Sequence, residues 1–267
     1  MIFTRPWFWI MLLCFLIVAV FVYFFLFYPG VQVKSITISG NQKVLSSEIE
    51  SLILSDVNKK ILGIGNWKVT SSSIFLANSA RLQKHILSAF PGVKEAKISK
   101  KFFQALNVQI GERSPVAIFC SAKEECFFID SEGIIFEPTP EEGESMVIVR
   151  QAINEQEVFI GKQAVKSNII DLLTRVEKSL KDGFQISLKE ALVSSSARLS
   201  IKTSEGWQIY FSLNEDIAVD LQITKLTLLL SGEISAGPEE NPRKNLRYID
   251  LRLKDRAIIC DNKTCGG

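Results

Sequence analysis

Residues 7–28 read WFWIMLLCFLIVAVFVYFFLFY, a run of 22 residues without a charged side chain. A helix of this length is about 33 Å long, which is enough to cross a bilayer core of about 30 Å. Tryptophan and tyrosine rings stand near both ends of the run, where the headgroup level of a membrane favours them. Pro29 and Gly30 then end the helix. The run predicts one transmembrane helix between a short cytoplasmic tail, residues 1–6, and a large polar part.

The alternative interpretation of this run is a cleaved signal peptide. Its apolar core is too long and too aromatic for a signal peptide, and no small-residue cleavage site follows Tyr28. Arg5 is the one basic side chain before the run, so the charge bias that sets orientation is thin. We expect an uncleaved anchor in the cytoplasmic membrane, with the N-terminus inside and the rest of the chain outside.

The charge of the chain is nearly balanced, with 31 basic and 29 acidic residues and a net charge of +2. This balance gives no electrostatic footprint for nucleic acid. The residues after the anchor are enough for two small domains or one large domain.

Four of the five cysteines form two close pairs, Cys120 with Cys126 and Cys260 with Cys265. Outside a membrane, such pairs favour two disulfides. Free thiols and a zinc site are the alternatives, although a four-cysteine zinc site prefers closer spacing within each pair. Cys14 lies in the anchor and is expected to be inert.

Residues 31–114 predict a compact α+β domain with the order strand, helix, helix, strand, strand. The glycines Gly63 and Gly65, with Asn66, predict a loop between the two helices. The expected elements are a strand at 31–38, a helix from the capping box Ser47 and Glu50 to Leu54 with Ile49, Leu52 and Ile53 inward, a helix capped by Asn78 or Ser79, and strands at 93–99 and 106–110.

Residues 115–260 predict a second domain that is mainly antiparallel β with two or three helices, and residues 261–267 predict a tail. Its clearest pattern is a hairpin in which Trp207, Ile209 and Phe211 alternate with polar positions. The other expected elements are strands at 116–120, 127–129, 134–136 and 146–149, a helix at 167–180, a helix from Asp216 to about Leu230 with Ile217, Leu221 and Leu228 inward, a strand at 248–253 and a strand at 257–259.

Four segments resemble the POTRA domain of the FtsQ/DivIB family of bacterial division proteins. They are ITISGNQKV at 36–44, SIFLANSARL at 73–82, FPGVKEAKI at 90–98 and LNVQIGERSPVA at 106–117. The last of these contains the E-R-x-P-V-A junction of the family at 112–117. The segments FFIDSEGIIF at 127–136 and RYIDLRL at 247–253 are similar to the opening hairpin and the closing strand of the family's β domain, and Lys225 matches a lysine common in the helix before that strand.

The sequence contains no constellation of catalytic residues. G-x-S-x-G, H-E-x-x-H, P-loop and G-x-G-x-x-G motifs are all missing from it. We therefore expect a protein that is not an enzyme and that needs no cofactor or metal.

Binding by strand addition is the favoured mode, because an unpaired sheet edge can accept an extended peptide. The resemblance implies that a bitopic coiled-coil pair, similar to FtsB/DivIC and FtsL, docks on the closing strand. The alternative is an internal strand that residues 257–259 cover. The residues expected to bind are Tyr248, Ile249, Asp250, Leu251, Arg252 and Leu253.

The resemblance implies a bitopic scaffold of the divisome at the division septum, which links early and late division proteins and helps to control septal wall synthesis. One alternative is a POTRA protein of secretion or outer-membrane assembly, which would need several POTRA units or a C-terminal barrel. Another is a membrane-anchored envelope enzyme, for which no nucleophile can be nominated.

Overall fold

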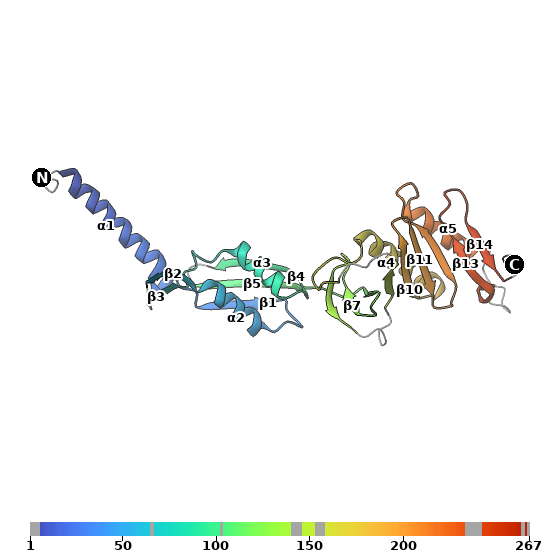
Figure 1. The fold of residues 1–267 in the computed structure, drawn as a ribbon, viewed down its shortest axis with the longest axis horizontal. Coiled ribbons are helices and arrows are strands. Elements are labelled where there is room, and N and C mark those ends of the chain that lie inside the picture. The colour runs from blue at the N-terminus through green and yellow to red at the C-terminus, as the bar shows by residue number, and fades with distance from the viewer. Residues whose placement is uncertain are drawn as a thin grey trace. The chain divides into compact units, whose positions relative to one another are not determined.

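The computed structural model describes residues 6–64, 67–101, 104–139, 146–152, 158–232, 242–262 and 265. The chain divides into two compact units, the first ending at Arg113 and the second beginning at Ser114 (Figure 1). Helices and mixed sheets occur in both units, which confirms the predicted α+β class.

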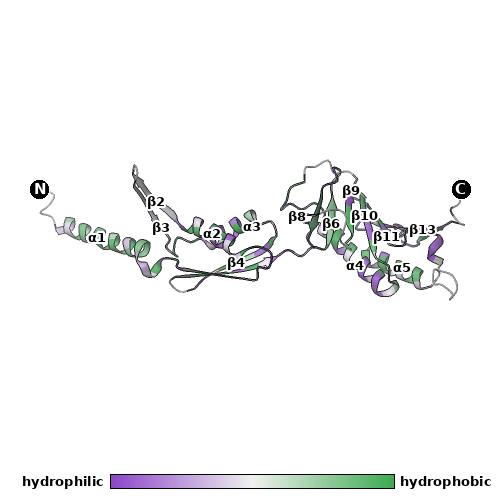
Figure 2. Ribbon diagram, turned by 90° about the horizontal axis from the view of Figure 1, so that it is seen from below, coloured by the Kyte–Doolittle hydropathy of each residue, from purple (hydrophilic) through white to green (hydrophobic). Residues whose placement is uncertain are grey.

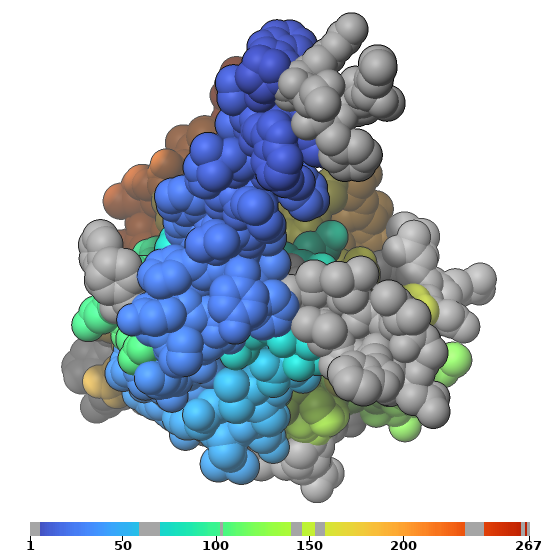
Figure 3. All heavy atoms as spheres, turned by 90° about the vertical axis from the view of Figure 1, so that its left-hand side faces the viewer, coloured from blue at the N-terminus to red at the C-terminus, as the bar shows by residue number. Residues whose placement is uncertain are grey.

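The helix α1, Pro6–Phe27, contains the apolar run, and none of its side chains is buried by the rest of the chain. In the part of the chain that the structure describes, α1 is the one helix long and apolar enough to cross a membrane. Figure 2 shows its ribbon coloured mainly as hydrophobic. A short helical turn, η1 (Pro29–Val31), follows it. In space-filling view the dark blue atoms of α1 continue without a break into the residues that follow (Figure 3).

The first unit is built on a sheet with the strand order β1-β5-β4, in which β1 is parallel and β4 antiparallel to β5. Apolar residues of two helices and of this sheet form one core, which includes Ile53, Ile86 and Val108. The predicted elements occur in the predicted order, but a hairpin of two further strands, β2 and β3, lies between the two helices. The elements are β1 Ser35–Ser39, α2 Ser46–Val57, β2 Lys59–Ile64, β3 Trp67–Ser71, α3 Ser79–Ala89, β4 Val93–Lys101 and β5 Ala105–Glu112.

Of the two helix caps predicted in this unit, one is confirmed and one is wrong. The Asn78 side chain caps α3 by accepting a hydrogen bond from the Arg81 N–H at 3.1 Å. The capping box expected at Ser47 was wrong, because α2 begins at Ser46 after Leu45, which makes no side-chain cap. Leu52, expected inward, is only partly buried.

A hairpin of β2 and β3 occupies the segment that Gly63, Gly65 and Asn66 predicted as a loop. Gly63 lies within β2, so the loop prediction was wrong there, while Gly65 and Asn66 lie outside the described residues.

The second unit is a mixed sheet with the order β14-β13-β12-β11-β10-β9-β6-β7-β8. Its strands are β6 Ala117–Cys120, β7 Cys126–Ile129, β8 Ile135–Pro138, β9 Ile148–Gln151, β10 Leu188–Ser195, β11 Arg198–Thr203, β12 Gln208–Ser212, β13 Leu246–Asp250 and β14 Ile258–Asp261. The predicted hairpin is the antiparallel pair of β11 and β12. The strand β10 was missed, and parallel pairs such as β12 with β13 make the sheet less antiparallel than expected.

Two helices, α4 (Ser167–Phe184) and α5 (Val219–Ser231), pack on the sheet with Trp207 and Phe211 in a common core. The expected inward face of α5 was wrong. Leu221 is 40% exposed and Leu228 is 64% exposed, whereas Gln222, Leu226 and Leu230 are buried. The helix also begins at Val219, so Ile217 precedes it.

Candidate functional site

Strand β13 contains the expected binding residues Tyr248, Ile249 and Asp250, but it does not form an exposed edge. Strand β13 pairs with β12 on one side and with β14 on the other. It is therefore an internal strand, as the alternative interpretation had it, and residues 248–253 do not form a free edge. Residues 251–253 also lie beyond the strand, which ends at Asp250.

The edge of the sheet at this end is β14, Ile258–Asp261, and no described strand pairs with its outer side. The other end is closed differently. Ile135 of β8 exchanges backbone hydrogen bonds with residues 161 and 162, at 2.7 and 2.9 Å, and Pro138 ends that strand. Because an edge is either covered or available, β14 is the end of the sheet that can accept another strand.

The side chains of β13 alternate between the two faces of the sheet. Ile249 and Leu251 are fully buried in the core. Tyr248 and Asp250 share the opposite face with Ile258 of β14, which stands across from Asp250 and is 43% exposed. Leu253 is partly exposed after the strand, and its carbonyl accepts a hydrogen bond from Lys225 Nζ at 2.7 Å. Of the predicted residues, Ile249 and Leu251 therefore serve the core.

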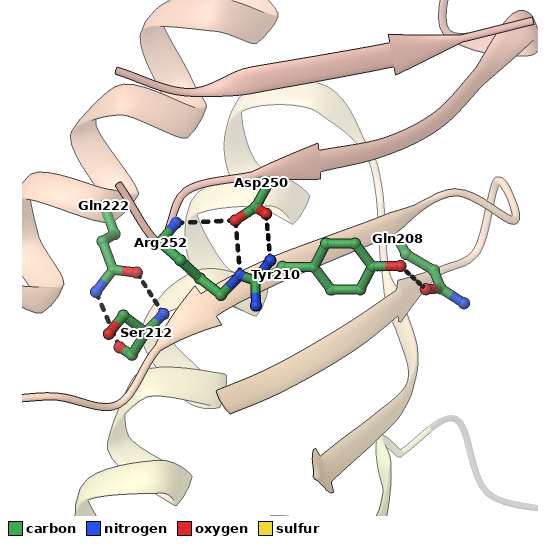
Figure 4. Close-up of polar contacts among 6 residues, drawn as sticks. All are labelled: Gln208, Tyr210, Ser212, Gln222, Asp250 and Arg252. Carbon is green, nitrogen blue, oxygen red and sulfur yellow. Dashed lines mark hydrogen bonds and ion pairs between the residues drawn. The ribbon is translucent and has the colours of Figure 1, made fainter. Parts of the chain in front are cut away.

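Arg252 folds its guanidinium back onto the carboxylate of Asp250 (Figure 4). The Nε–Oδ1 distance is 2.9 Å, the Nη2–Oδ2 distance is 2.6 Å, and the Arg252 N–H donates to Oδ1 at 3.1 Å. Burial alone raises the pKa of Asp250, but the hydrogen bonds from Arg252 outweigh it and hold that pKa below its ordinary value. The hydrogen bonds to Asp250 in turn raise the pKa of Arg252.

Two tyrosines and a second arginine complete this surface. The rings of Tyr210 on β12 and Tyr248 on β13 lie 5.3 Å apart between centroids. The guanidinium carbons of Arg198 and Arg252 lie over the Tyr210 ring at 4.5 and 5.6 Å. The Tyr210 hydroxyl donates to Oε1 of Gln208 at 2.7 Å (Figure 4). We call Arg198, Tyr210, Tyr248, Asp250, Arg252 and Ile258 the tyrosine–arginine face.

This composition suits protein binding better than catalysis. Tyrosine and arginine are enriched at the energetic centres of protein interfaces. The described residues contain no group of three or more His, Cys, Asp or Glu side chains that could hold a metal ion. The face was only partly predictable, because Tyr210 and Arg198 come from an earlier hairpin and had not been nominated. Tyr210 did carry a signal, since it alternates with the apolar residues of that hairpin.

The opposite side of β12 is fixed by Gln222 of α5 (Figure 4). Its Oε1 accepts a hydrogen bond from the Ser212 N–H at 2.8 Å, and its Nε2 donates to the Ser212 carbonyl at 3.0 Å. A buried amide must be paired in this way. This pairing explains the rotation of α5, because it turns residues 222, 226 and 230 toward the sheet.

Two disulfides lie in this unit. Cys120 and Cys126 face each other across the hairpin of β6 and β7, with their Cα atoms 4.1 Å apart. Cys260 of the edge strand β14 is joined to Cys265, with a Cα separation of 5.5 Å. Cys14 in α1 is unpaired.

Comparison with known families covers most of the chain. The model of the FtsQ-type POTRA domain matches residues 31–113, and the model of the C-terminal part of cell division protein FtsQ/DivIB matches residues 120–252. No curated protein matches the chain. Both models agree with the resemblance in the sequence motifs, and the chain belongs to the FtsQ/DivIB family of cell division proteins.

Proposed function

We propose that the protein is a membrane-anchored scaffold of the divisome that binds its partners at the edge strand β14. The proposed partners are bitopic coiled-coil division proteins similar to FtsB/DivIC and FtsL. The anchor α1 holds the chain in the cytoplasmic membrane at the septum, with the N-terminus inside and both folded units outside. In this role the protein links early and late division proteins and helps to control septal wall synthesis, and we assign it no reaction.

One observation carries the proposal, namely the position of an unpaired edge beside the tyrosine–arginine face. A strand added to β14 would gain main-chain hydrogen bonds along Ile258–Cys260, because the Asp261 carbonyl already accepts a hydrogen bond from the Cys265 N–H. Its alternate side chains would meet Ile258 and its neighbours Tyr248 and Arg252, which give specificity. In this proposal β14, and not the internal residues 248–253, accepts the strand.

The test is a pull-down of the tagged full-length protein from gently solubilised membranes, with Ile258→Asp beside the unchanged protein. Leu192→Asp is the matched control, because Leu192 lies on the same face of the sheet, on β10, and is also exposed. Small single-span coiled-coil proteins should be recovered with the unchanged protein and with Leu192→Asp, and lost with Ile258→Asp.

Recovery of the same partners with Ile258→Asp would contradict an edge site at β14. Loss with both variants would show that the charge acts on the whole sheet. Leu251→Asp is unsuitable for this test, because Leu251 is fully buried and an unpaired carboxylate there would unfold the unit. Fluorescence of the buried Trp207 reports whether each variant is folded.

A further inference from the structure

The last turn of α1 is bound by side chains of the first folded unit. Helices leave their last carbonyls without partners inside the helix. The Leu26 carbonyl accepts hydrogen bonds from Ser71 Oγ at 2.5 Å and from Gln32 Nε2 at 2.7 Å. The Phe25 carbonyl accepts one from Ser73 Oγ at 2.7 Å. The segment that follows β3 is therefore tied directly to the end of the apolar helix.

Further hydrogen bonds hold this segment in one conformation. Gln32 Oε1 accepts from both the N–H and the hydroxyl of Ser72, at 3.0 and 2.7 Å. The Val33 N–H donates to the Ser72 carbonyl, and the Ile74 N–H donates to the Val31 carbonyl. The segment 71–75 is thus a fixed base beneath the unit.

Phe75 is the exposed aromatic residue of this base. Its ring meets the Phe25 ring of α1 edge to face, with centroids 5.0 Å apart, and 53% of the residue remains exposed. The next residue before it, Ile74, is buried in the core of the unit. A half-exposed phenylalanine is easily explained if the medium around it is not water.

The position of Phe25 in α1 indicates how deep the Phe75 ring would lie in a membrane that α1 spans. Phe25 lies two residues before the end of α1 at Phe27, which is about 3 Å along the helix axis. In a helix that spans a bilayer this level is the boundary between acyl chains and headgroups, where aromatic rings are favoured. The apolar side chains Val18, Phe21, Val22, Phe25 and Leu26 line one shallow groove on α1, so the Phe75 ring stands at the end of a lipid-facing surface.

The polar groups in the base fit the same level. Lipid excludes backbone groups without hydrogen bonds. Here the helix carbonyls and the hydroxyls of Ser71 and Ser73 satisfy one another. We infer that the base at 71–75 is seated in the interface of the bilayer that holds α1, with the Phe75 ring among the acyl-chain ends. This inference rests on the anchoring of α1 in a membrane.

The test uses the full-length protein in phosphatidylcholine–phosphatidylglycerol vesicles with a thiol-reactive fluorophore and lipids that carry a quencher at a shallow or a deep position. Phe75→Cys in a Cys14→Ser background is labelled, while the disulfide cysteines do not react. The label at position 75 should lose most of its emission with the shallow quencher and less with the deep one.

Two other label positions make the result decisive. Cys14 of the unchanged protein lies inside α1 and should be quenched more by the deep lipid. Leu45→Cys, in the same Cys14→Ser background, labels a residue that is 61% exposed beside the turn that Glu112 binds. Strand β5 runs from the membrane end of the unit, where Gln104 beside its start donates to the Pro29 carbonyl, to Glu112 at its other end. The length of this strand separates Leu45 from the membrane end by about 23 Å. Its label should not be quenched.

Three outcomes would overturn the inference. A label at position 75 that behaves like the one at position 45 places the base in water. A blue-shifted label at position 75 that no lipid quencher reaches means that another protein helix covers Phe75. An unquenched Cys14 label removes the anchoring itself, and a quenched Cys14 label beside an unquenched position 75 refutes the seated base alone.

Discussion

Gln222 on α5 pairs with both backbone polar groups of Ser212 on β12, in a fully buried position. Ser212 pairs with Arg198 of β11 on one side, and the Gln222 side chain takes the place of a strand partner on the other side. The helix and the sheet are held in one relative rotation by this contact, which no apolar pattern in the sequence reveals.

Replacing Gln222 with alanine should destabilise the second unit by about 3 kcal/mol, because it leaves a buried N–H and a buried carbonyl without partners. Hydrogen exchange of the peptide that contains Ser212 should lose its protection, and the urea midpoint should fall. Gln208→Ala is the control, since Gln208 is exposed on the same strand and should change stability by less than about 0.5 kcal/mol. Equal effects of the two variants would refute the assigned role.

The carboxylate of Glu112 binds the turn after β1. Its Oε1 accepts hydrogen bonds from the N–H groups of Gln42, Lys43 and Val44 at 2.9, 3.0 and 2.9 Å. Burial alone raises the pKa of Glu112, but these hydrogen bonds lower it below the ordinary value of 4.5. The stabilisation is therefore present above the pKa of the unfolded chain and is lost as the pH falls through the lowered pKa of the folded state.

Glu112→Gln should accordingly destabilise the first unit by about 1–2 kcal/mol at neutral pH and by little at acid pH. Urea unfolding at both pH values measures this. Glu95→Gln is the matched control, because Glu95 makes only an exposed ion pair with Lys97. A difference between unchanged protein and Glu112→Gln that persists in acid would contradict the carboxylate mechanism.

Arg252→Ala should leave the Asp250 carboxylate, which is only 7% exposed as a residue, without its fork of hydrogen bonds. We expect a loss of about 2 kcal/mol at neutral pH and a rise in the pKa of Asp250, because the side-chain hydrogen bonds that lower this pKa are lost while burial still raises it. In the unchanged protein this stabilisation is lost as the pH falls through the lowered pKa of Asp250.

Carbon-detected NMR titration of the aspartate side chains measures the pKa of Asp250 in both proteins. Arg247→Ala is the control on the same strand, since Arg247 bonds only to Asn262 at the surface. An unchanged pKa of Asp250 in the Arg252 variant would show that the fork is not its cause.

The two disulfides can be tested by mass measurement after alkylation. Alkylation of the unreduced, denatured protein should add a single group, at Cys14, and alkylation after reduction should add five. Cys14→Ser should take up none before reduction. Uptake of five groups without reduction would refute both disulfides and show that all the cysteines are free thiols.

Regular patterns made much of the fold predictable. Three patterns were predictable because each is formed by residues close together in the sequence. They are the uncharged run of α1, the alternation in β11 and β12, and the Asn78 cap. The hairpin of β2 and β3 was missed because Gly63, which favours a loop prediction, lies in a paired strand. The face of α5 was missed because a polar residue, Gln222, turns inward to meet Ser212.

The candidate site could be predicted only in part, because its decisive property is not local. Alternation in 247–253 indicates which residues share a face, and Tyr248 and Asp250 do lie on one face. It cannot show that β14 returns to pair with β13 and moves the edge by one strand. Ile249 and Leu251 were predicted to bind because the resemblance covers the whole closing strand, but both are buried in the core.

The edge strand β14 has only four residues, and the Asp261 carbonyl is already bonded, so an added strand would pair with it over about 10 Å. So short a ladder cannot hold a partner by main-chain hydrogen bonds alone, and a complex without side-chain contacts would dissociate readily.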